Sequence, residues 1–114
     1  MVQTKTIPDL VNYTLRTALG ILDGTETPTA DQVRDVKDVY SVVYSELADK
    51  GLAYWDEENI PSAIFDPLCR FCGSRIAPSF GLPQDVSLEK YAESEMRKHT
   101  SKTSSKLPVP GQYF

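Results

Sequence analysis

Apolar residues recur along this chain at spacings of three and four, which is the period of amphipathic helices. No stretch shows the strict alternation that would predict a convincing strand. The pattern predicts helices over about 8–19 and 28–50, a third beginning near Pro61 or Pro67 and ending before Pro78, and a fourth from Asp85 or Ser87 to about His99.

These elements predict an all-α fold, a small four-helix bundle with an extended C-terminal arm. The chain has 114 residues, which is enough for one domain with a modest core. We expect residues 1–100 to form the helical domain. Residues 101–114, rich in Ser, Thr, Lys and Pro, are expected to form the arm.

Capping signals mark the start and the end of the second helix. Thr27 before Pro28 offers a capping hydroxyl, and Thr29 with Gln32 offers a capping box one step later. Both starts remain open at this level. Gly51 is a natural stop, because glycine adopts the left-handed conformation that often follows a helix.

The third helix is apolar nearly all round, which is typical of a central, buried helix. Its start is ambiguous, since Asp66-Pro67 is either a cap with the first helical residue or a kink in a longer helix. The connection LAYWDEENI before it is partly apolar, and we expect it to fold back over the helices. The apolar positions of the third helix are Phe65, Leu68, Cys69, Phe71, Cys72 and Ile76.

The pair Cys69 and Cys72, in CRFCG, is the feature most suggestive of zinc or redox chemistry. A structural zinc site needs four ligands, and this pair with the distant His99 supplies at most three. A thioredoxin-type motif needs a preceding strand, and none is predicted. We therefore interpret both thiols as small apolar groups of the core.

No constellation of catalytic residues is apparent in the sequence. The single histidine has no obvious nucleophilic partner, and the GxxxxGK[ST] phosphate loop is absent. The acids 56–58 are interpreted as favourable charge before a helix start, because the spacing of an EF-hand is missing. We predict a protein that is not an enzyme and uses no cofactor. Two neighbouring aromatics, Tyr54 and Trp55, are candidates either for partner anchors or for a loop that covers the core.

Charge divides the chain in two. Residues 1–96 carry 8 Lys/Arg and 16 Asp/Glu, whereas residues 97–114 carry four basic residues and no acid. The acidic body argues against tight, non-specific binding to duplex DNA, which requires neutralisation of phosphates. A basic, proline-containing tail on an acidic body suggests a tail that meets a different molecule. Its basic residues are Arg97, Lys98, Lys102 and Lys106.

The last residues, LPVPGQYF, are unusually apolar for a chain end. Burial of each large side chain would return about 1.5–3 kcal/mol, whereas ordering the backbone costs about 1–2 kcal/mol per residue. These contributions nearly cancel, so we expect a lone arm to be loose and a partner to order it. The residues concerned are Leu107, Pro108, Val109, Pro110, Tyr113 and Phe114.

Three stretches resemble the small head–tail adaptor (connector) proteins of tailed bacteriophages. They are LRTALGILDGTETPTADQ, YSELADKGLAYWDEENIPSAIFDPLCRFCGSRIAPSFGLP and the terminal QYF. The similarity covers most of residues 10–83 and the last few residues. The sequence departs from this pattern at CRFCG, where plain apolar residues are expected, and in a rather polar last helix.

The resemblance implies a helical virion protein that assembles with copies of itself, as a ring of twelve, below the portal protein. Such a ring extends the DNA channel, lets DNA pass without specific binding and presents a platform to the next neck or tail protein. Leu107 to Phe114 would be the portal-binding arm, and the four basic residues its stalk. A negatively charged channel would repel phosphates, and Asp31, Asp35 and Asp38 are candidates for its lining.

Two other classes remain open. One is a small cytoplasmic helical binding or regulatory module whose tail is a peptide ligand. The other is a redox or zinc protein that uses the two cysteines. The chain lacks a membrane-length apolar run and a basic-then-apolar leader, so we expect synthesis in the bacterial cytoplasm and, for an adaptor, a final place in the virion neck.

Overall fold

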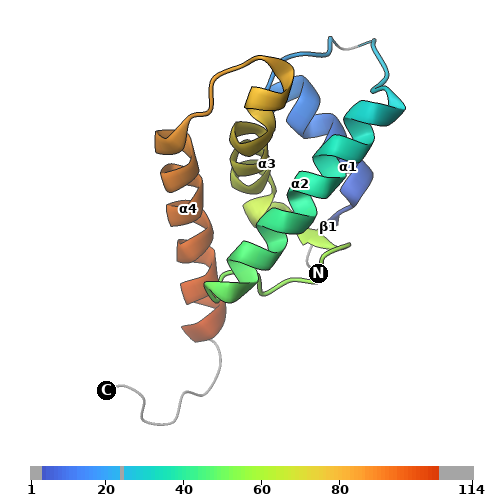
Figure 1. Cartoon of the computed structure of the whole chain (residues 1–114). Coiled ribbons are helices and arrows are strands. Elements are labelled where there is room, and N and C mark those ends of the chain that lie inside the picture. Colours follow the sequence, from blue (N-terminus) through green and yellow to red (C-terminus); the bar gives the residue numbers. More distant parts are fainter. Residues whose placement is uncertain (1–3, 24, 106–114) are drawn as a thin grey trace.

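The computed structural model describes residues 4–23 and 25–105, and it is mostly helical (Figure 1). This agrees with the predicted all-α class. Two very short strands, which the sequence pattern did not predict, pair antiparallel. In chain order the elements are β1 (Thr4–Lys5), α1 (Ile7–Tyr13), the π-helix η1 (Thr14–Ala18), α2 (Ala30–Asp49), β2 (Ile60–Pro61), α3 (Ser62–Ile76), the 3-10 helix η2 (Ala77–Phe80) and α4 (Val86–Ser105).

The first helix is set by its cap and changes pitch in its second half. Thr6 and Asp9 form a capping box, in which each side chain accepts a hydrogen bond from the backbone N–H of the other. Pro8 lies in the first turn, where its missing N–H costs nothing. From Thr14 the chain continues as η1, and Gly20 follows with a φ of +67°.

In α2 the structure selects one of the two predicted starts. Thr29 caps the helix, and it forms the capping box with Gln32 rather than leaving the role to Thr27. Gly51 has a φ of +76° and ends the helix as predicted. The apolar seam faces inward, with Val36, Tyr40, Val43 and Leu47 buried.

The central helix is α3, which lies between α4 on one side and α1, η1 and α2 on the other (Figure 1). It begins at Ser62, so Pro67 lies inside the helix and Asp66 is not its cap. Asp66 instead accepts hydrogen bonds from Tyr13 and Arg70, which joins α1 to α3. The helix is buried along most of its length, as its apolar sequence predicted.

A close approach of two backbones fixes the contact between α3 and η1. A Cβ added at Gly73 would lie 3.0 Å from the Cβ of Ala18, a distance tighter than nearly all observed contacts. Glycine therefore serves close packing at this position rather than backbone freedom, since Gly73 is helical and a larger residue would require Ala18 to shift. The contact brings the pitch change of η1 against the middle of the core.

The connection from α2 to α3 folds back over the helices, as predicted, and Leu52, Trp55 and Ile60 in it are buried. Two tyrosines of α2 hold it by their hydroxyls. Tyr40 donates to the carbonyl of Glu57 at 2.7 Å, and Tyr44 donates to the carbonyl of Trp55 at 2.5 Å. This loop is therefore part of the folded body.

The last helix, α4, is longer than predicted. Asp85, not Ser87, caps it by accepting the N–H of Leu88 at 3.0 Å. It continues to Ser105, beyond the expected end near His99, so the first residues of the predicted arm are helical. No proline or glycine occurs between residues 86 and 106, and nothing in the local sequence forces an earlier stop. None of the described helices is both long and apolar enough to cross a membrane.

Candidate functional site

The predicted acidic face lies on the exposed side of α2. Asp31 and Asp38 are exposed, and the side chain of Asp35 is 43% exposed. Arg34 lies among them and pairs with Asp31 at 3.1 Å and with Asp35 at 3.8 Å. The three aspartates therefore share one surface, but a cation offsets part of their charge. Asp38 borders an apolar hollow on the same helix.

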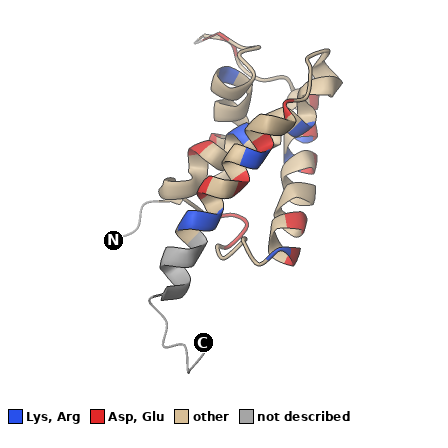
Figure 2. Ribbon diagram, turned by 90° about the vertical axis from the view of Figure 1, so that its left-hand side faces the viewer, with Lys and Arg blue, Asp and Glu red and all other residues tan. Residues whose placement is uncertain are grey.

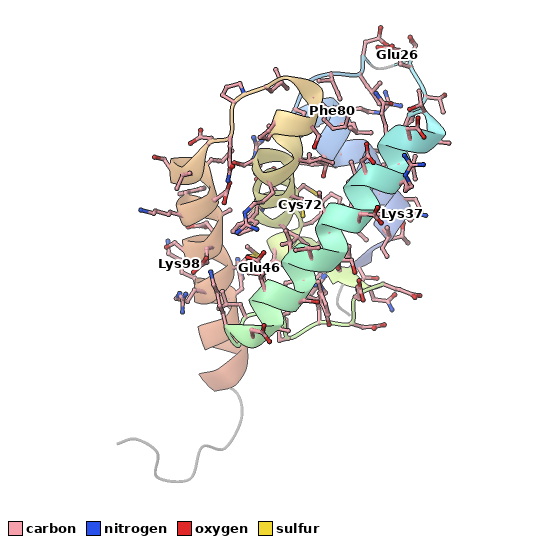
Figure 3. All side chains as sticks on the ribbon, in the orientation of Figure 1. Glu26, Lys37, Glu46, Cys72, Phe80 and Lys98 are labelled. Atoms are coloured by element: carbon pink, nitrogen blue, oxygen red, sulfur yellow. The ribbon has the colours of Figure 1, made fainter. Side chains whose placement is uncertain are left out.

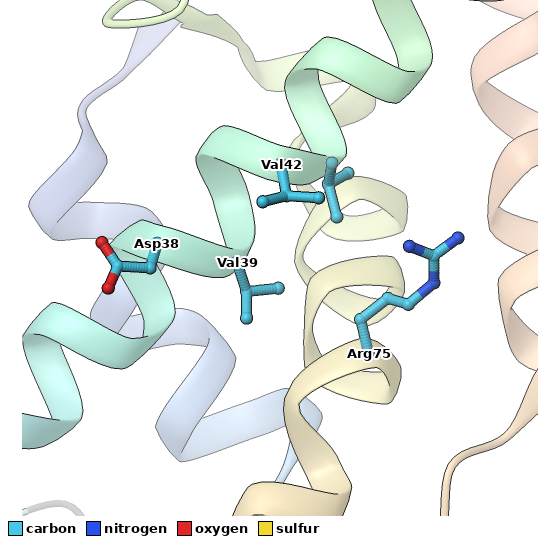
Figure 4. Close-up of a pocket in the computed structure, with 5 residues that line it drawn as sticks. Asp38, Val39, Val42 and Arg75 are labelled. Atoms are coloured by element: carbon cyan, nitrogen blue, oxygen red, sulfur yellow. The ribbon is translucent and has the colours of Figure 1, made fainter.

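An apolar hollow opens beside Asp38 on the side of α2 that faces α4 (Figure 4). Its volume is about 300 Å³, and Val39, Val42 and Val43 supply its apolar surface. Val43 is buried, whereas Val42 is 58% exposed. Arg75 of α3 completes the lining. Sequence reasoning did not identify this hollow, although the doublet Val42-Val43 was a signal, because only one of two adjacent helical positions faces the core.

Arg75 is the centre of a polar clamp that joins α2, α3 and α4. Its Nη1 and Nη2 donate to the two carboxylate oxygens of Glu46 at 2.8 and 3.0 Å, and its Nε donates to Glu89 Oε1 at 2.9 Å. Its guanidinium also lies 5.0 Å from the ring centre of Phe71. Figure 3 shows Glu46 on α2 pointing toward this region. A bidentate arginine pair of this kind specifies orientation as well as attraction.

The clamp continues into the start of α4 through Glu89, which is a buried charge. Its second carboxylate oxygen accepts from Ser74 and from Gln84, both at 2.7 Å. Burial alone would raise the pKa of Glu89, but these bonds and Arg75 outweigh it and lower the pKa below its ordinary value. Hydrogen bonds from Arg75 likewise lower the pKa of Glu46. These shifts come from hydrogen bonds and ion pairs that join α2, α3 and α4.

The two cysteines are free and fully buried in the core, as predicted, and Figure 3 labels Cys72 on α3. Burial raises the pKa of Cys69 to about 12 and raises that of Cys72 well above its ordinary value. Both are therefore thiols at neutral pH, in the unreactive form. Within residues 4–23 and 25–105, no group of His, Cys, Asp and Glu is arranged to hold a metal ion.

Tyr54 and Trp55, the candidates for partner anchors or for a loop that covers the core, differ in burial. Trp55 is only 6% exposed, and its indole N–H donates to the Tyr40 hydroxyl at 3.3 Å. It is a core residue and not an interface anchor. Tyr54 is 40% exposed and packs edge-on against Trp55, with ring centres 5.4 Å apart, so it stays a surface candidate.

Of the four residues of the predicted basic stalk, the structure describes the side chains of Arg97 and Lys98. Arg97 pairs with Glu93 at 2.9 Å, and Lys98 pairs with Glu95 at 2.9 Å, both along the exposed side of α4. Figure 2 places α4 toward the viewer and shows acidic and basic residues interspersed along it. Lys102 lies in the helix backbone, while Lys106 and the predicted portal-binding arm from Leu107 to Phe114 lie outside the described residues.

A second exposed apolar residue lies on α4. The sequence predicted an inward stripe that included Tyr91 or Ala92, and the structure buries Ala92 and Met96 while leaving Tyr91 60% exposed. Tyr91 is therefore a surface residue. The described part of the chain thus presents an apolar hollow on α2 and an exposed aromatic ring on α4. No family model, curated protein or solved structure matches this chain.

Proposed function

We propose that this protein is a structural head–tail adaptor of a tailed bacteriophage, which assembles as a ring below the portal protein and joins the capsid to the tail. The proposal is supported by the resemblance of its motifs to adaptor proteins. The same motifs have structural duties in this chain. TPTADQ forms the capping box of α2, and the segment around YWDEENIP forms the loop that closes the core.

The observation that carries the proposal is the length of α4, which continues to Ser105. Met96 is the last buried residue of α4 whose side chain is described. From there to Ser105 the helical rise carries the backbone about 13 Å further. An apolar, proline-bracketed segment follows, which is too short to form a core of its own. A helix that ends directly before such a segment is suited to present it to a neighbouring protein.

In this proposal the arm of Leu107, Pro108, Val109, Pro110, Tyr113 and Phe114 docks on the portal protein, and the platform of the ring receives the next neck or tail protein. The acidic excess of residues 1–96 would let DNA pass through the channel without adhering. Asp31, Asp35 and Asp38 are the candidates for that lining. The final location is the virion neck.

Deletion of residues 107–114 tests this function. The truncated chain is expected to fold, with the helical circular dichroism of the full chain, and to be absent from particles that contain the portal. A length-matched variant with Leu107, Val109, Tyr113 and Phe114 changed to Ser should behave like the deletion, because it keeps the length and removes the apolar groups. Full incorporation of either variant into particles would contradict the role of the arm.

The second candidate, a helical binding module whose tail is a peptide ligand, predicts a different result. Its tail would bind a host protein in the absence of any portal, and the full chain would not enter particles. Imaging of purified particles or necks for a ring of this chain separates the two functions directly.

A further inference from the structure

We draw no further inference here: the strongest candidate, the apolar hollow on α2 between Asp38 and Arg75, carries none because nothing in the structure shows what covers it.

Discussion

Helices α3 and α4 lie side by side, yet they are held in the molecule by different forces. In α3, nine of 15 residues are buried, and they contact α1, η1, α2 and α4. In α4, the buried side chains described are Ala92, Met96 and the charged Glu89. Apolar burial therefore fastens α3, whereas hydrogen bonds and ion pairs contribute much of what fastens α4.

This difference predicts which helix keeps its stability, and which loses it, when pH and ionic strength change. Apolar burial is not screened by salt and does not depend on the protonation of carboxylates, but it depends on close packing. Ion pairs depend on pH, on ionic strength and on geometry. We expect α3 to define the cooperative core, and α4 to be the element that responds first to solution conditions. Four predictions follow from this contrast, in order of decreasing effect.

The largest effect is expected from a cavity in α3. Leu68 is fully buried, and Leu68→Ala removes methyl groups that no neighbour can replace. It should lower the free energy of unfolding by about 2–5 kcal/mol, as other buried leucines do. Urea denaturation followed by circular dichroism measures this. A loss below about 1 kcal/mol would mean that α3 is not the packed centre.

Loss of the clamp should affect α4 more than α3. Arg75→Met keeps the apolar stem over Phe71 and removes the charge that Glu46 and Glu89 share. Two carboxylates then lose a donor, which should cost about 1–3 kcal/mol. Hydrogen exchange should accelerate in α4 more than in the interior of α3.

A matched substitution of an exposed arginine provides the control for the clamp. Arg34→Met breaks the pairs on the open surface of α2, which are worth about 0–1 kcal/mol. It should leave exchange in α4 unchanged. Equal acceleration in α3 and α4 for Arg75→Met would contradict the assignment of the clamp to α4.

Acid should loosen the same helix. The pKa values of Glu46, Glu89 and Glu93 are lowered from an ordinary value of 4.5. A carboxyl group whose pKa is lower in the folded chain than in the unfolded chain stabilises the fold. This stabilisation is complete at a pH above the pKa in the unfolded chain, and it is lost as the pH falls through the pKa in the folded chain. Stability should therefore be flat near neutral pH and decline below about pH 5. Glu89→Gln should flatten part of that decline in a series of denaturation curves, and an unchanged pH profile would exclude Glu89 from it.

The smallest effect is expected at the end of α2. Lys50 pairs with Glu93 at 2.8 Å, with the side chains 45% and 24% exposed. Lys50→Met should lower the free energy of unfolding by only about 0–1 kcal/mol, and the difference should vanish at high salt because the pair is screened. A larger loss that persists in salt would indicate a packing role for the lysine stem.

Local signals accounted for most of the helical elements. The seam of α2, the all-round apolar character of α3 and the glycine stop at Gly51 are properties of short stretches of sequence, and all three are observed. The choice of Thr29 over Thr27 was not a local property, because both hydroxyls could cap. Similarly, Pro67 permits either a start or an interior position, and the buried residues before it decide that α3 begins at Ser62.

The surface features were less accessible to sequence reasoning. Periodicity assigned Tyr91 or Ala92 to the inner stripe of α4, and only the packing against α3 decided that the smaller residue faces inward. Val42 and Val43 are adjacent and both apolar, so the sequence could not show which of the two packs in the core and which stays exposed. Arg75 was not singled out by any motif, because its partners lie 29 residues before it and 14 residues after it in the chain.

The amino-acid sequence by itself determined which segments are helical and limited the starts of α2 and α3 to two candidates each, because caps, prolines, glycines and apolar spacing act within a few residues. It also determined the uneven distribution of charge along the chain. Only the tertiary structure decided which apolar groups stay on the surface and which charges meet, since those outcomes depend on contacts between residues far apart in the chain. The pairing of Arg75 with Glu46 and Glu89, the hollow beside Asp38 and the outward ring of Tyr91 all arise in this way.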